Sequence, residues 1–387
     1  MLRDAPGRYV ASLAGGETVR AFVPDPLPPV PPLDLDGARQ AALEQATLAL
    51  GRLDSIALLL PDPQLFLYAY VRREAVVSSQ IEGTQSSLSD LLLFELDEMP
   101  GVPFDDVVEV SNYVAALQHG MARLREGFPL CNRLLREMHE HLMARGRGAD
   151  KAPGEFRRSQ NWIGGTRPGN ASFVPPPPQE VAPCMAALEG FIHSETAKLP
   201  VLLKAALVHV QFETIHPFLD GNGRLGRLLI ALLLHQGGAL AQPLLYLSLF
   251  FKQHRARYYE LLDRVRTSGD WEAWVDFFLE GVEQSATGAV QTARRLVDLF
   301  QRDSQRVQVG GRSAATVLRL LEALRQRPLS SLRQIGQQAG ISFPTAAKAM
   351  LTLVDLGIAR ELTGQRRNRV FVYDAYLNIL NEGGEAL

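Results

Sequence analysis

The chain has 387 residues, of which 46% are hydrophobic and 21% charged, and its formal net charge is -2. This composition is typical of a globular protein of about two or three domains, and it excludes binding to nucleic acid or membranes through overall charge. The two cysteines, Cys131 and Cys184, do not make the disulfide framework of a small secreted protein. No apolar run approaches the roughly 20 residues of a membrane span, and none near the start has signal-peptide length. We therefore expect a soluble, cytoplasmic protein without membrane contact.

The N-terminal part is predicted to be a proline-rich arm followed by helices. Prolines crowd residues 22–35 and hold the backbone extended. We expect this arm to pack on the body; binding to a proline-recognition module is the alternative. Apolar residues then recur at helical spacing, and Gly83 closes the second of the helices they predict. The predicted helices lie at 38–60, 64–82, 87–98, 107–125, 132–144 and 181–198, so the body should be mainly α.

One segment of the body has a different pattern. Between residues 161 and 178, two short apolar stretches flank the glycine-containing loop 164–170, which predicts a β-hairpin. Residues 199–213 then form a nearly wholly apolar stretch, which predicts a central buried helix. A second buried helix is predicted at 224–236, and the most informative motif lies between the two.

The composition changes after about residue 304, and residues 307–311 interrupt the helical pattern as a linker would. Three helices are predicted beyond it, at 314–325, 332–340 and 343–356, followed by strands at 358–362 and 369–373. This order is typical of a winged helix-turn-helix. Lys348 lies on its third helix and Arg366, Arg367 and Arg369 at its wing, where they suit a phosphate backbone. Contact with DNA and contact with protein, including dimerisation, remain equal alternatives.

Residues 216–227 read His-Pro-Phe-Leu-Asp-Gly-Asn-Gly-Arg-Leu-Gly-Arg. The Gly-Asn-Gly turn at 221–223 comes directly before an apolar helix, so its backbone amides and the positive helix end can face an anion. Arg224 and Arg227 are one turn apart and can point at the same polyphosphate. The segment therefore predicts a phosphate-handling site.

Two further residues complete the chemistry of this segment. Asp220 can hold Mg²⁺ that bridges phosphate oxygens, and a neutral His216 can take a proton from an attacking hydroxyl. The glycines also fit Gly-x-Gly-x-x-Gly, but no strand precedes them and no βαβ alternation follows, which excludes a Rossmann site. His139 and His141 lie two residues apart and face different sides of a helix, so they do not predict a zinc site.

At these residues the sequence resembles the Fic family, whose signature His-x-Phe-x-[Asp/Glu]-Gly-Asn-Gly-Arg-x-x-Arg is matched throughout 216–227. Fic enzymes transfer AMP from ATP to a hydroxyl of a target protein. The resemblance implies that His216 deprotonates a Ser, Thr or Tyr hydroxyl, that Asp220 binds Mg²⁺ and that Arg227 grips the γ-phosphate. It also implies that Phe218 anchors the loop in the core. The nucleotide-binding residues of the motif would be Gly221, Asn222, Gly223, Arg224, Gly226 and Arg227.

Residues 78–83 resemble the inhibitory motif of the same family, [Ser/Thr]-x-x-x-Glu-[Gly/Asn]. The resemblance implies that Glu82, followed by Gly83, pairs with Arg227 and withholds it from the γ-phosphate, while Ser78 orients the glutamate. The protein would then carry its inhibitory helix in the same chain. An ordinary helix end with an exposed glutamate is the alternative.

The resemblance assigns the remaining parts of the chain as well. The hairpin at 161–178 would be the flap that aligns an extended target segment. Tyr258 and Tyr259 would line the adenosine pocket, although helix packing explains them equally well. We expect an N-terminal region at 1–105 with the inhibitory motif, a Fic core at 106–305 and a winged helix-turn-helix domain at 306–387.

Alternative functions remain open from the sequence. A Fic-derived transcription regulator would bind DNA and show little turnover, and a de-adenylylating enzyme would use Glu82 to position water. A Fic relative that transfers another phosphate-containing group is a third alternative. The target protein and the modified residue are not evident from the sequence, and a homodimer remains open.

Overall fold

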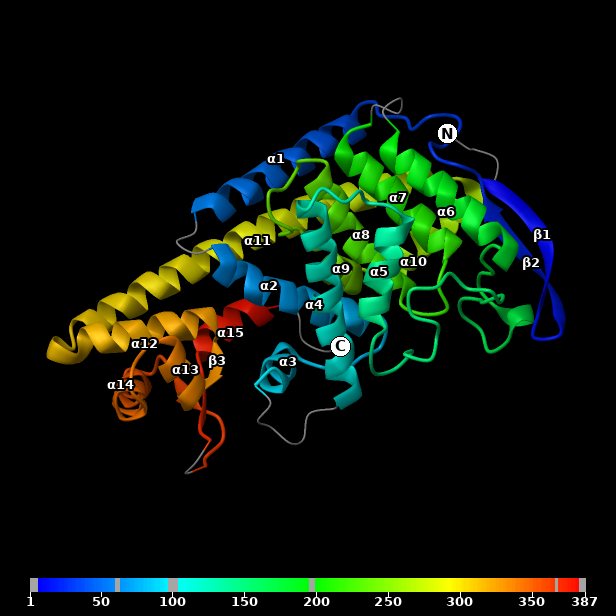
Figure 1. Cartoon of the computed structure of the whole chain (residues 1–387). Coiled ribbons are helices and arrows are strands. Elements are labelled where there is room, and N and C mark those ends of the chain that lie inside the picture. Colours follow the sequence, from blue (N-terminus) through cyan, green and yellow to red (C-terminus); the bar gives the residue numbers. More distant parts are fainter. Residues whose placement is uncertain (1–5, 60–62, 97–103, 195–198, 366–367, 383–387) are drawn as a thin grey trace.

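The fold comes from a computed structural model, which describes residues 6–59, 63–96, 104–194, 199–365 and 368–382. Its body is a bundle of helices with a two-stranded hairpin at one end and a smaller group of helices with a three-stranded sheet at the other (Figure 1). One cluster of buried apolar side chains runs through both groups of helices. The prediction of a mainly α protein is confirmed.

The long helix α11 (Trp271–Gln308) and the buried helix pair α7 (Val201–Ile215) and α8 (Asn222–Gln236) form the centre of the body. Nearly all side chains of α7 and α8 are buried, as expected of helices that are apolar all round. Trp274 of α11 is fully buried, and its indole N–H donates to the carbonyl of Ala206 at 2.9 Å. This packing holds α7 and α8 in position, and the 216–227 motif begins at the end of α7 and continues into α8.

The other helices of the body surround this centre. Helix α1 (Ala38–Leu59) packs along α11, α2 contacts α4 and α9, and α4 packs on α5 and α8. The start of α3 has a capping box, because Ser87 and Asp90 bind each other's backbone N–H groups at 3.1 and 2.8 Å. The bounds of these helices are α2 (Pro63–Ile81), α3 (Leu88–Phe94), α4 (Phe104–Arg125), α5 (Asn132–Leu142), α6 (Pro178–His193), α9 (Ser248–Gln253) and α10 (Arg255–Ser268).

These bounds agree with the predicted helices to within a few residues. The helices predicted at 87–98 and 181–198 end earlier, at Phe94 and His193. Residues 97–98 and 195–198 lie outside the described part of the chain.

An N-terminal hairpin was not anticipated from the sequence. Strands β1 (Gly7–Ala14) and β2 (Glu17–Pro24) pair antiparallel, with Ala14 opposite Glu17. Gly15 and Gly16 make the connecting turn with φ of 55° and 82°, values that suit glycine in a tight two-residue hairpin. The proline-rich segment that follows is joined to the body: Gln211 donates to the carbonyl of Asp25 at 2.8 Å.

The C-terminal region contains the predicted helices and an unpredicted strand. Its three-stranded antiparallel sheet has the order β3-β5-β4, and the helix α15 closes the region against α2 and α11. Arg369 bonds to Glu361 at 2.8 Å, and residues 366–367 lie outside the described part. The elements are α12 (Ala314–Gln326), β3 (Leu329–Ser331), α13 (Leu332–Gln338), α14 (Phe343–Asp355), β4 (Arg360–Glu361), β5 (Val370–Val372) and α15 (Asp374–Asn381). A winged helix remains a prediction for this region.

Helix α11 joins the body to the C-terminal region. It runs to Gln308, so the predicted boundary between 305 and 306 falls within its last turn, and the chain then turns at Val309 and Gly310. The predicted linker at 307–311 is therefore shorter than expected. The division into three domains remains a prediction.

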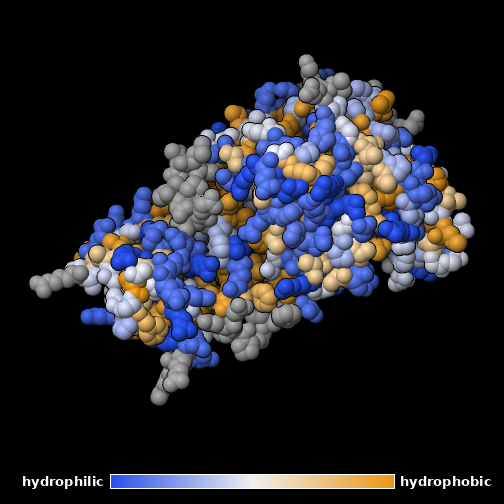
Figure 2. All heavy atoms as spheres, in the orientation of Figure 1, coloured by the Kyte–Doolittle hydropathy of each residue, from blue (hydrophilic) through white to orange (hydrophobic). Residues whose placement is uncertain are grey.

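The surface carries polar and apolar residues side by side on the face shown in Figure 2. Among the described residues, no helix combines the length and the apolar character that crossing a membrane requires.

Replacing Gly120 by alanine should destabilise the packing of α4. A Cβ at this position would lie 2.7 Å from Sδ of Met138 on α5 and 2.9 Å from Cδ2 of Leu232 on α8. We expect Gly120→Ala to lower the free energy of unfolding by about 1–3 kcal/mol. Gly51→Ala on α1 is the control, because no atom lies within 4 Å of its added Cβ, and it should raise stability by up to about 1 kcal/mol. Equal midpoints of the two variants in denaturant unfolding would contradict this packing.

Candidate active site at the start of helix α8

The candidate site is built on the loop between α7 and α8. Helix α7 ends at His216, which adopts the left-handed conformation with φ 51° and ψ 59° and whose N–H bonds to the carbonyl of Phe212 at 2.9 Å. Gly221, with φ 76°, is the N-cap of α8. The backbone amides of the first turn of α8 have no partner within the helix, because they begin it, and the binding of an anion there stays a prediction.

Asn222 and His139 hold this loop in shape. The amide side chain of Asn222 accepts from the N–H of Phe218 and donates to its carbonyl, both at 2.9 Å. Phe218 is fully buried, as the resemblance implied, and its ring stacks on His139 with centroids 3.8 Å apart. The N–H of Gly154 donates to Nδ1 of His139, so Nε2 carries the proton and donates to the carbonyl of Asp220 at 3.0 Å. The side chain of Asn222 therefore stabilises the loop, and its backbone N–H is the group left for the predicted phosphate.

Arg157 clamps the other end of the loop. Its side chain is buried, Nε donates to the carbonyl of His216 at 2.9 Å and a terminal nitrogen donates to the carbonyl of Pro176. Burial lowers the pKa of Arg157 to about 10. The guanidinium still carries its charge at neutral pH, so it fixes His216 through the backbone and leaves the imidazole free.

The imidazole of His216 is neutral at physiological pH. Burial, and after it the positive charges of Arg266 and Arg157, lower its pKa to about 3. Nδ1 of His216 is buried and has no hydrogen-bond partner among the described residues. A neutral imidazole can accept a proton, which is the state that the predicted base requires.

Arg227, at the second turn of α8, contacts the end of α2. Nε of Arg227 donates to the hydroxyl of Ser78 at 2.8 Å, and one terminal nitrogen donates to the carbonyl of Ser78 at 2.9 Å and to Glu82 at 2.8 Å. The arginine side chain is 2% exposed and the glutamate side chain 31%. The residues of the two separate motifs therefore meet in one ion pair, with Gly83 at φ 102° just beyond it.

The pair is held by charge and by close backbone packing. Burial opposes ionisation of Glu82, but the charge and hydrogen bonds of Arg227 outweigh it and hold the pKa of Glu82 below its usual value. Burial likewise opposes the charge of Arg227, and the charge of Glu82 leads the interactions that raise the arginine's pKa. A Cβ at Gly223 would lie 2.3 Å from Oε1 of Glu82, so the glutamate occupies space that only glycine leaves open at the start of α8.

Arg224, three residues before Arg227 on α8, pairs with Glu109 and with Asp220, which precedes the helix. Arg224 is 1% exposed and binds Glu109 of α4 at 3.0 Å, with Asp220 more distant at 3.5 Å. Burial raises the pKa of Glu109 despite the nearby charges of Arg224 and Arg147. The sequence analysis did not single out Glu109, because a glutamate inside a helix has no distinguishing pattern.

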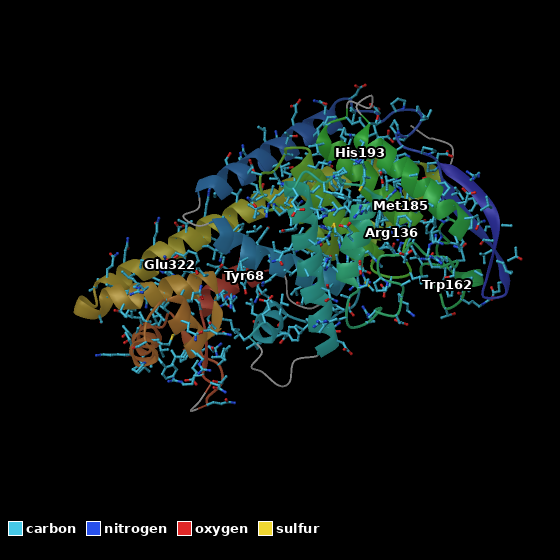
Figure 3. All side chains as sticks on the ribbon, viewed as in Figure 1. Tyr68, Arg136, Trp162, Met185, His193 and Glu322 are labelled. Atoms are coloured by element: carbon cyan, nitrogen blue, oxygen red, sulfur yellow. The ribbon has the colours of Figure 1, made fainter. Side chains whose placement is uncertain are left out.

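The hairpin predicted at 161–178 is present in reduced form, and its role as a flap stays a prediction. Ile163 and Phe173 form a single antiparallel bridge, with the N–H of Ile163 bonded to the carbonyl of Phe173 at 2.8 Å, so the two predicted strands do not form. The guanidinium of Arg266 lies 4.1 Å from the centre of the Phe173 ring and donates to the carbonyl of Glu213 at 3.1 Å. These contacts join the flap to the helix that carries the loop. Trp162, at the outer part of the flap, is 38% exposed (Figure 3).

The two tyrosines predicted for the adenosine pocket differ in environment. Tyr258 is fully buried, stacks on Phe251 and has its hydroxyl 2.9 Å from Nε2 of His209. Its side chain therefore packs among helices, the alternative that the sequence left open. Tyr259 is 40% exposed, with the Arg255 guanidinium 5.7 Å from its ring, and remains the candidate for an adenosine contact.

Two buried carboxyls near Arg227 were not anticipated. Burial raises the pKa of Glu74 and of Glu213 to about 7. Glu74 accepts hydrogen bonds from Ser248 and, at 3.1 Å, from Tyr113. Oε1 of Glu213 has no partner among the described residues and would contact a Cβ placed at Gly226 at 2.4 Å. Gly226 is thus required by the packing of α7 on α8.

Comparison with known proteins agrees with this geometry. Residues 40–122 match the N-terminal domain of the Fic/DOC family, and residues 129–234 match the Fic/DOC family domain itself. The chain therefore carries a Fic domain together with the N-terminal domain of that family. The inhibitory motif at 78–83 lies within the first match and the 216–227 motif within the second.

Relatives and solved structures support the same assignment. The chain is 33% identical over 211 residues to the protein adenylyltransferase Fic of Culex quinquefasciatus and 30% identical over 208 residues to that of Drosophila willistoni. These matches cover 53% of the chain and 39% of each relative. A Fic family protein from Desulfovibrio desulfuricans has the same fold over 90% of this chain and 97% of its own, with a TM-score of 0.56 and 20% identity. Fic-1 from C. elegans aligns with a TM-score of 0.52 and 22% identity over 67% of this chain and 74% of its own.

The neutral state of His216 can be tested directly. We expect its imidazole to remain uncharged from about pH 8 down to about pH 5, because its pKa is lowered to about 3. NMR spectra of protein with labelled histidine would show this, with His216→Ala used to assign the signal. A titration midpoint near the ordinary histidine value of about 6.5 would contradict the burial and charge of this site.

The buried Glu74 should make stability depend on pH. Its folded-state pKa is raised from 4.5 to about 7, so the folded protein retains a proton that the unfolded chain loses, and stability falls as pH rises through that window. We expect Glu74→Gln to remove this loss, which is about 2–3 kcal/mol between pH 5 and pH 8. Denaturant unfolding of both proteins at the two pH values measures it. A Gln variant with the same pH dependence as the parent would show that Glu74 is ionised throughout.

Proposed function

We propose that the chain transfers AMP from ATP to a hydroxyl side chain of a target protein. The observation that carries the proposal is the meeting of three groups at one loop: the neutral His216, the open first turn of α8 and the buried Arg227. A proton acceptor, an anion-binding backbone and a cation are the groups that nucleotidyl transfer needs. The relatives named protein adenylyltransferase Fic share this region at about 30% identity, which supports the same chemistry.

Each residue has a definite part in the proposed reaction. Nε2 of His216 takes the proton of the attacking hydroxyl of a Ser, Thr or Tyr residue as the oxygen bonds to the α-phosphorus and pyrophosphate leaves. The first-turn amides at 221–224 bind the phosphate oxygens, and Arg224 adds positive charge next to them. Arg227, released from Glu82, binds the γ-phosphate. Gly223 leaves room beside the first turn for the phosphates once Glu82 has moved away, whereas Gly226 leaves room for Glu213 of α7.

The residues present fit a magnesium ion. Asp220 has a side chain 38% exposed, and its hydrogen bonds from Gly221 and Arg224 both go to Oδ1. Among the described residues nothing donates to Oδ2, which leaves that oxygen available to a cation. One carboxylate together with substrate phosphates and water is the usual magnesium environment in such sites. When bound, Mg²⁺ would neutralise charge on the phosphates.

We propose further that the pair between Glu82 and Arg227 restrains the enzyme. Arg227 uses Nε and one terminal nitrogen on Ser78 and Glu82, so these two donors are not available to a γ-phosphate while the pair is formed. Glu82 is 31% exposed and lies over Gly223, so its carboxylate also opposes an anion at the start of α8. Removal of this single carboxylate should free both the arginine and the anion site.

Loss of the carboxylate should increase AMP transfer. We expect Glu82→Gly to raise labelling of protein from α-labelled ATP with Mg²⁺ by about 10- to 100-fold, because a hydrogen bond to a charged group is worth about 1.5–3 kcal/mol. Glu82→Gln keeps an acceptor without the charge and should give an intermediate rate. Host lysate serves as substrate.

Two controls make the experiment decisive. Glu95→Gly removes another partly exposed glutamate, which pairs with Arg72 at a distance of 2.9 Å and does not contact the 216–227 loop. This variant should leave labelling unchanged. Glu82→Gly/His216→Ala should abolish it. If no variant labels any protein while ATP binds and the fold is intact, AMP transfer is refuted. De-adenylylation and DNA-binding regulation would then be tested next.

A further inference from the structure

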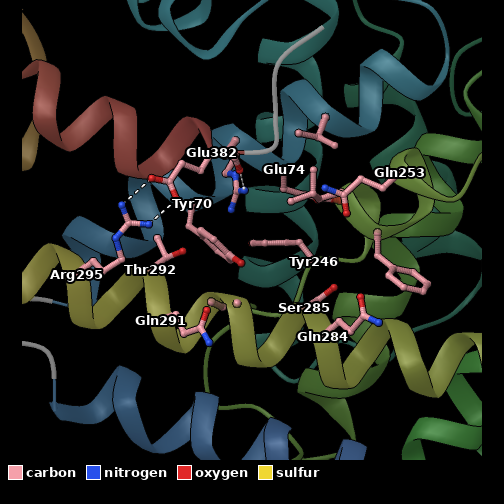
Figure 4. Close-up of a pocket in the computed structure, with 16 residues that line it drawn as sticks. Tyr70, Glu74, Tyr246, Gln253, Gln284, Ser285, Gln291, Thr292, Arg295 and Glu382 are labelled. Carbon is pink, nitrogen blue, oxygen red and sulfur yellow. Dashed lines mark hydrogen bonds and ion pairs between the residues drawn. The ribbon is translucent and has the colours of Figure 1, made fainter. Parts of the chain in front are cut away.

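A cavity of about 250 Å³ lies beside α2, the helix that leads into the predicted inhibitory motif (Figure 4). None of the residues that line it belongs to the 216–227 loop. It is bounded by α2, by α9 and the segment before it, by the middle of α11 and by Glu382 after α15. On α11 the residues facing it recur at helical spacing and are mostly polar: Gln284, Ser285, Gln291, Thr292 and Arg295.

The wall of the cavity contains buried polar atoms that lack partners. The hydroxyl of Tyr246 makes no hydrogen bond among the described residues, although the residue is only 7% exposed, and Nε of Arg73 is also unpartnered. Leaving such groups unpaired costs about 1–3 kcal/mol each. Figure 4 shows the ring of Tyr246 next to Tyr70, whose ring centre lies 5.5 Å away. The cavity thus combines aromatic walls with hydrogen-bonding capacity that is not used.

The mouth of the cavity already binds a carboxylate. Both terminal nitrogens of Arg295 donate to the side chain of Glu382 in a two-point contact, and Arg73 donates to the backbone carbonyl of the same residue at 2.6 Å. Arg295 and Glu382 have side chains 50% and 57% exposed, so the pair is open to exchange with solutes. A planar two-point contact is the geometry by which arginine recognises a carboxylate.

We propose that this cavity binds a small hydroxylated aromatic carboxylate. The carboxylate of the ligand replaces that of Glu382 on Arg295, and its hydroxyl bonds to Tyr246. Its ring packs on Tyr70 and Phe250, which both line the space. Such a molecule satisfies the unpartnered hydroxyl and keeps the arginine paired.

The site lies on the same helix as the inhibitory motif. Arg73 and Glu74 line the cavity, and Ser78 and Glu82 follow one and two turns later on α2 and bind Arg227. Glu382 accepts from Arg295 through its carboxylate and from Arg73 of α2 through its backbone carbonyl, so a ligand that takes Arg295 from the carboxylate loosens the residue that supports α2. Resting on the proposed function, we infer that the ligand weakens the inhibitory pair and raises AMP transfer.

Binding can be tested without any activity assay. The probe is 4-hydroxybenzoate, titrated into the full chain by calorimetry, with benzoate and 4-hydroxybenzamide as comparison compounds. Gly288→Leu should abolish binding, because nothing lies within 4 Å of a Cβ at this cavity position and the new side chain fills the space. Gly51→Leu on α1 is the matched control, open in the same way and outside the cavity, and should bind as the parent does.

The comparison compounds test each contact. The uncharged benzamide should bind at least about tenfold more weakly, because it loses the charge on Arg295. Tyr246→Phe should weaken binding of 4-hydroxybenzoate and leave benzoate unchanged. The proposal is overturned if 4-hydroxybenzoate and benzoate both fail to bind the parent at low millimolar concentration, or if Gly288→Leu binds as well as the parent.

The link to the inhibitory helix has its own readout. With the parent chain, 4-hydroxybenzoate should raise protein labelling from ATP several-fold, and with Gly288→Leu it should have no effect. Labelling that stays constant while the compound binds would refute the coupling. If Glu82→Gly itself shows no labelling, the AMP-transfer proposal fails, and calorimetry still decides whether the cavity is a ligand site.

Discussion

The site depends on one constraint: the charged guanidinium of Arg227 is buried and needs a partner of opposite charge. Arg227 is almost wholly buried at the second turn of α8, and a buried charge without a partner costs several kcal/mol. Ser78 of α2 and Glu82, just after its end, offset that cost by accepting hydrogen bonds from Arg227. Any ligand that takes Arg227 from Glu82 must offer an anion of comparable strength. In the proposed function, the same demand makes the arginine both the group that binds phosphate and the point of restraint.

In the loop before α8, some side chains hold the backbone and others are left available for chemistry. Asn222 and Phe218 belong to the motif but hold the backbone, while His139 and Arg157, outside the motif, grip the carbonyls of Asp220 and His216. Because these contacts go to the backbone, they fix the position of the loop without occupying its reactive groups. The imidazole of His216 and one oxygen of Asp220 remain available in consequence.

The sequence was sufficient to predict most of the helices and the motif pair. It was insufficient for α9, α10, α11 and α15, for which no range was predicted, and for the partners of the motif residues. Helical periodicity and glycine at helix ends are local signals, so α7, α8 and the end of α2 were located to within a few residues. Glu109 meets Arg224 across 115 positions and Arg157 meets His216 across 59, and only tertiary packing brings such residues together. The Gly15-Gly16 turn of the first hairpin is also a local signal, because a pair of glycines with positive φ suits a two-residue hairpin turn.

Helix α2 connects otherwise separate parts of the molecule, because its successive turns face different neighbours. Arg73 reaches the residue after α15, Glu74 takes hydrogen bonds from α4 and α9, and Glu82 binds α8. The hydrogen-bonded helix transmits a displacement at one turn to the next, since its residues cannot move independently. In the proposed mechanism, a change at the C-terminal region therefore reaches Arg227 along one helix, from Arg73 to Ser78 and on to Glu82 just beyond its end.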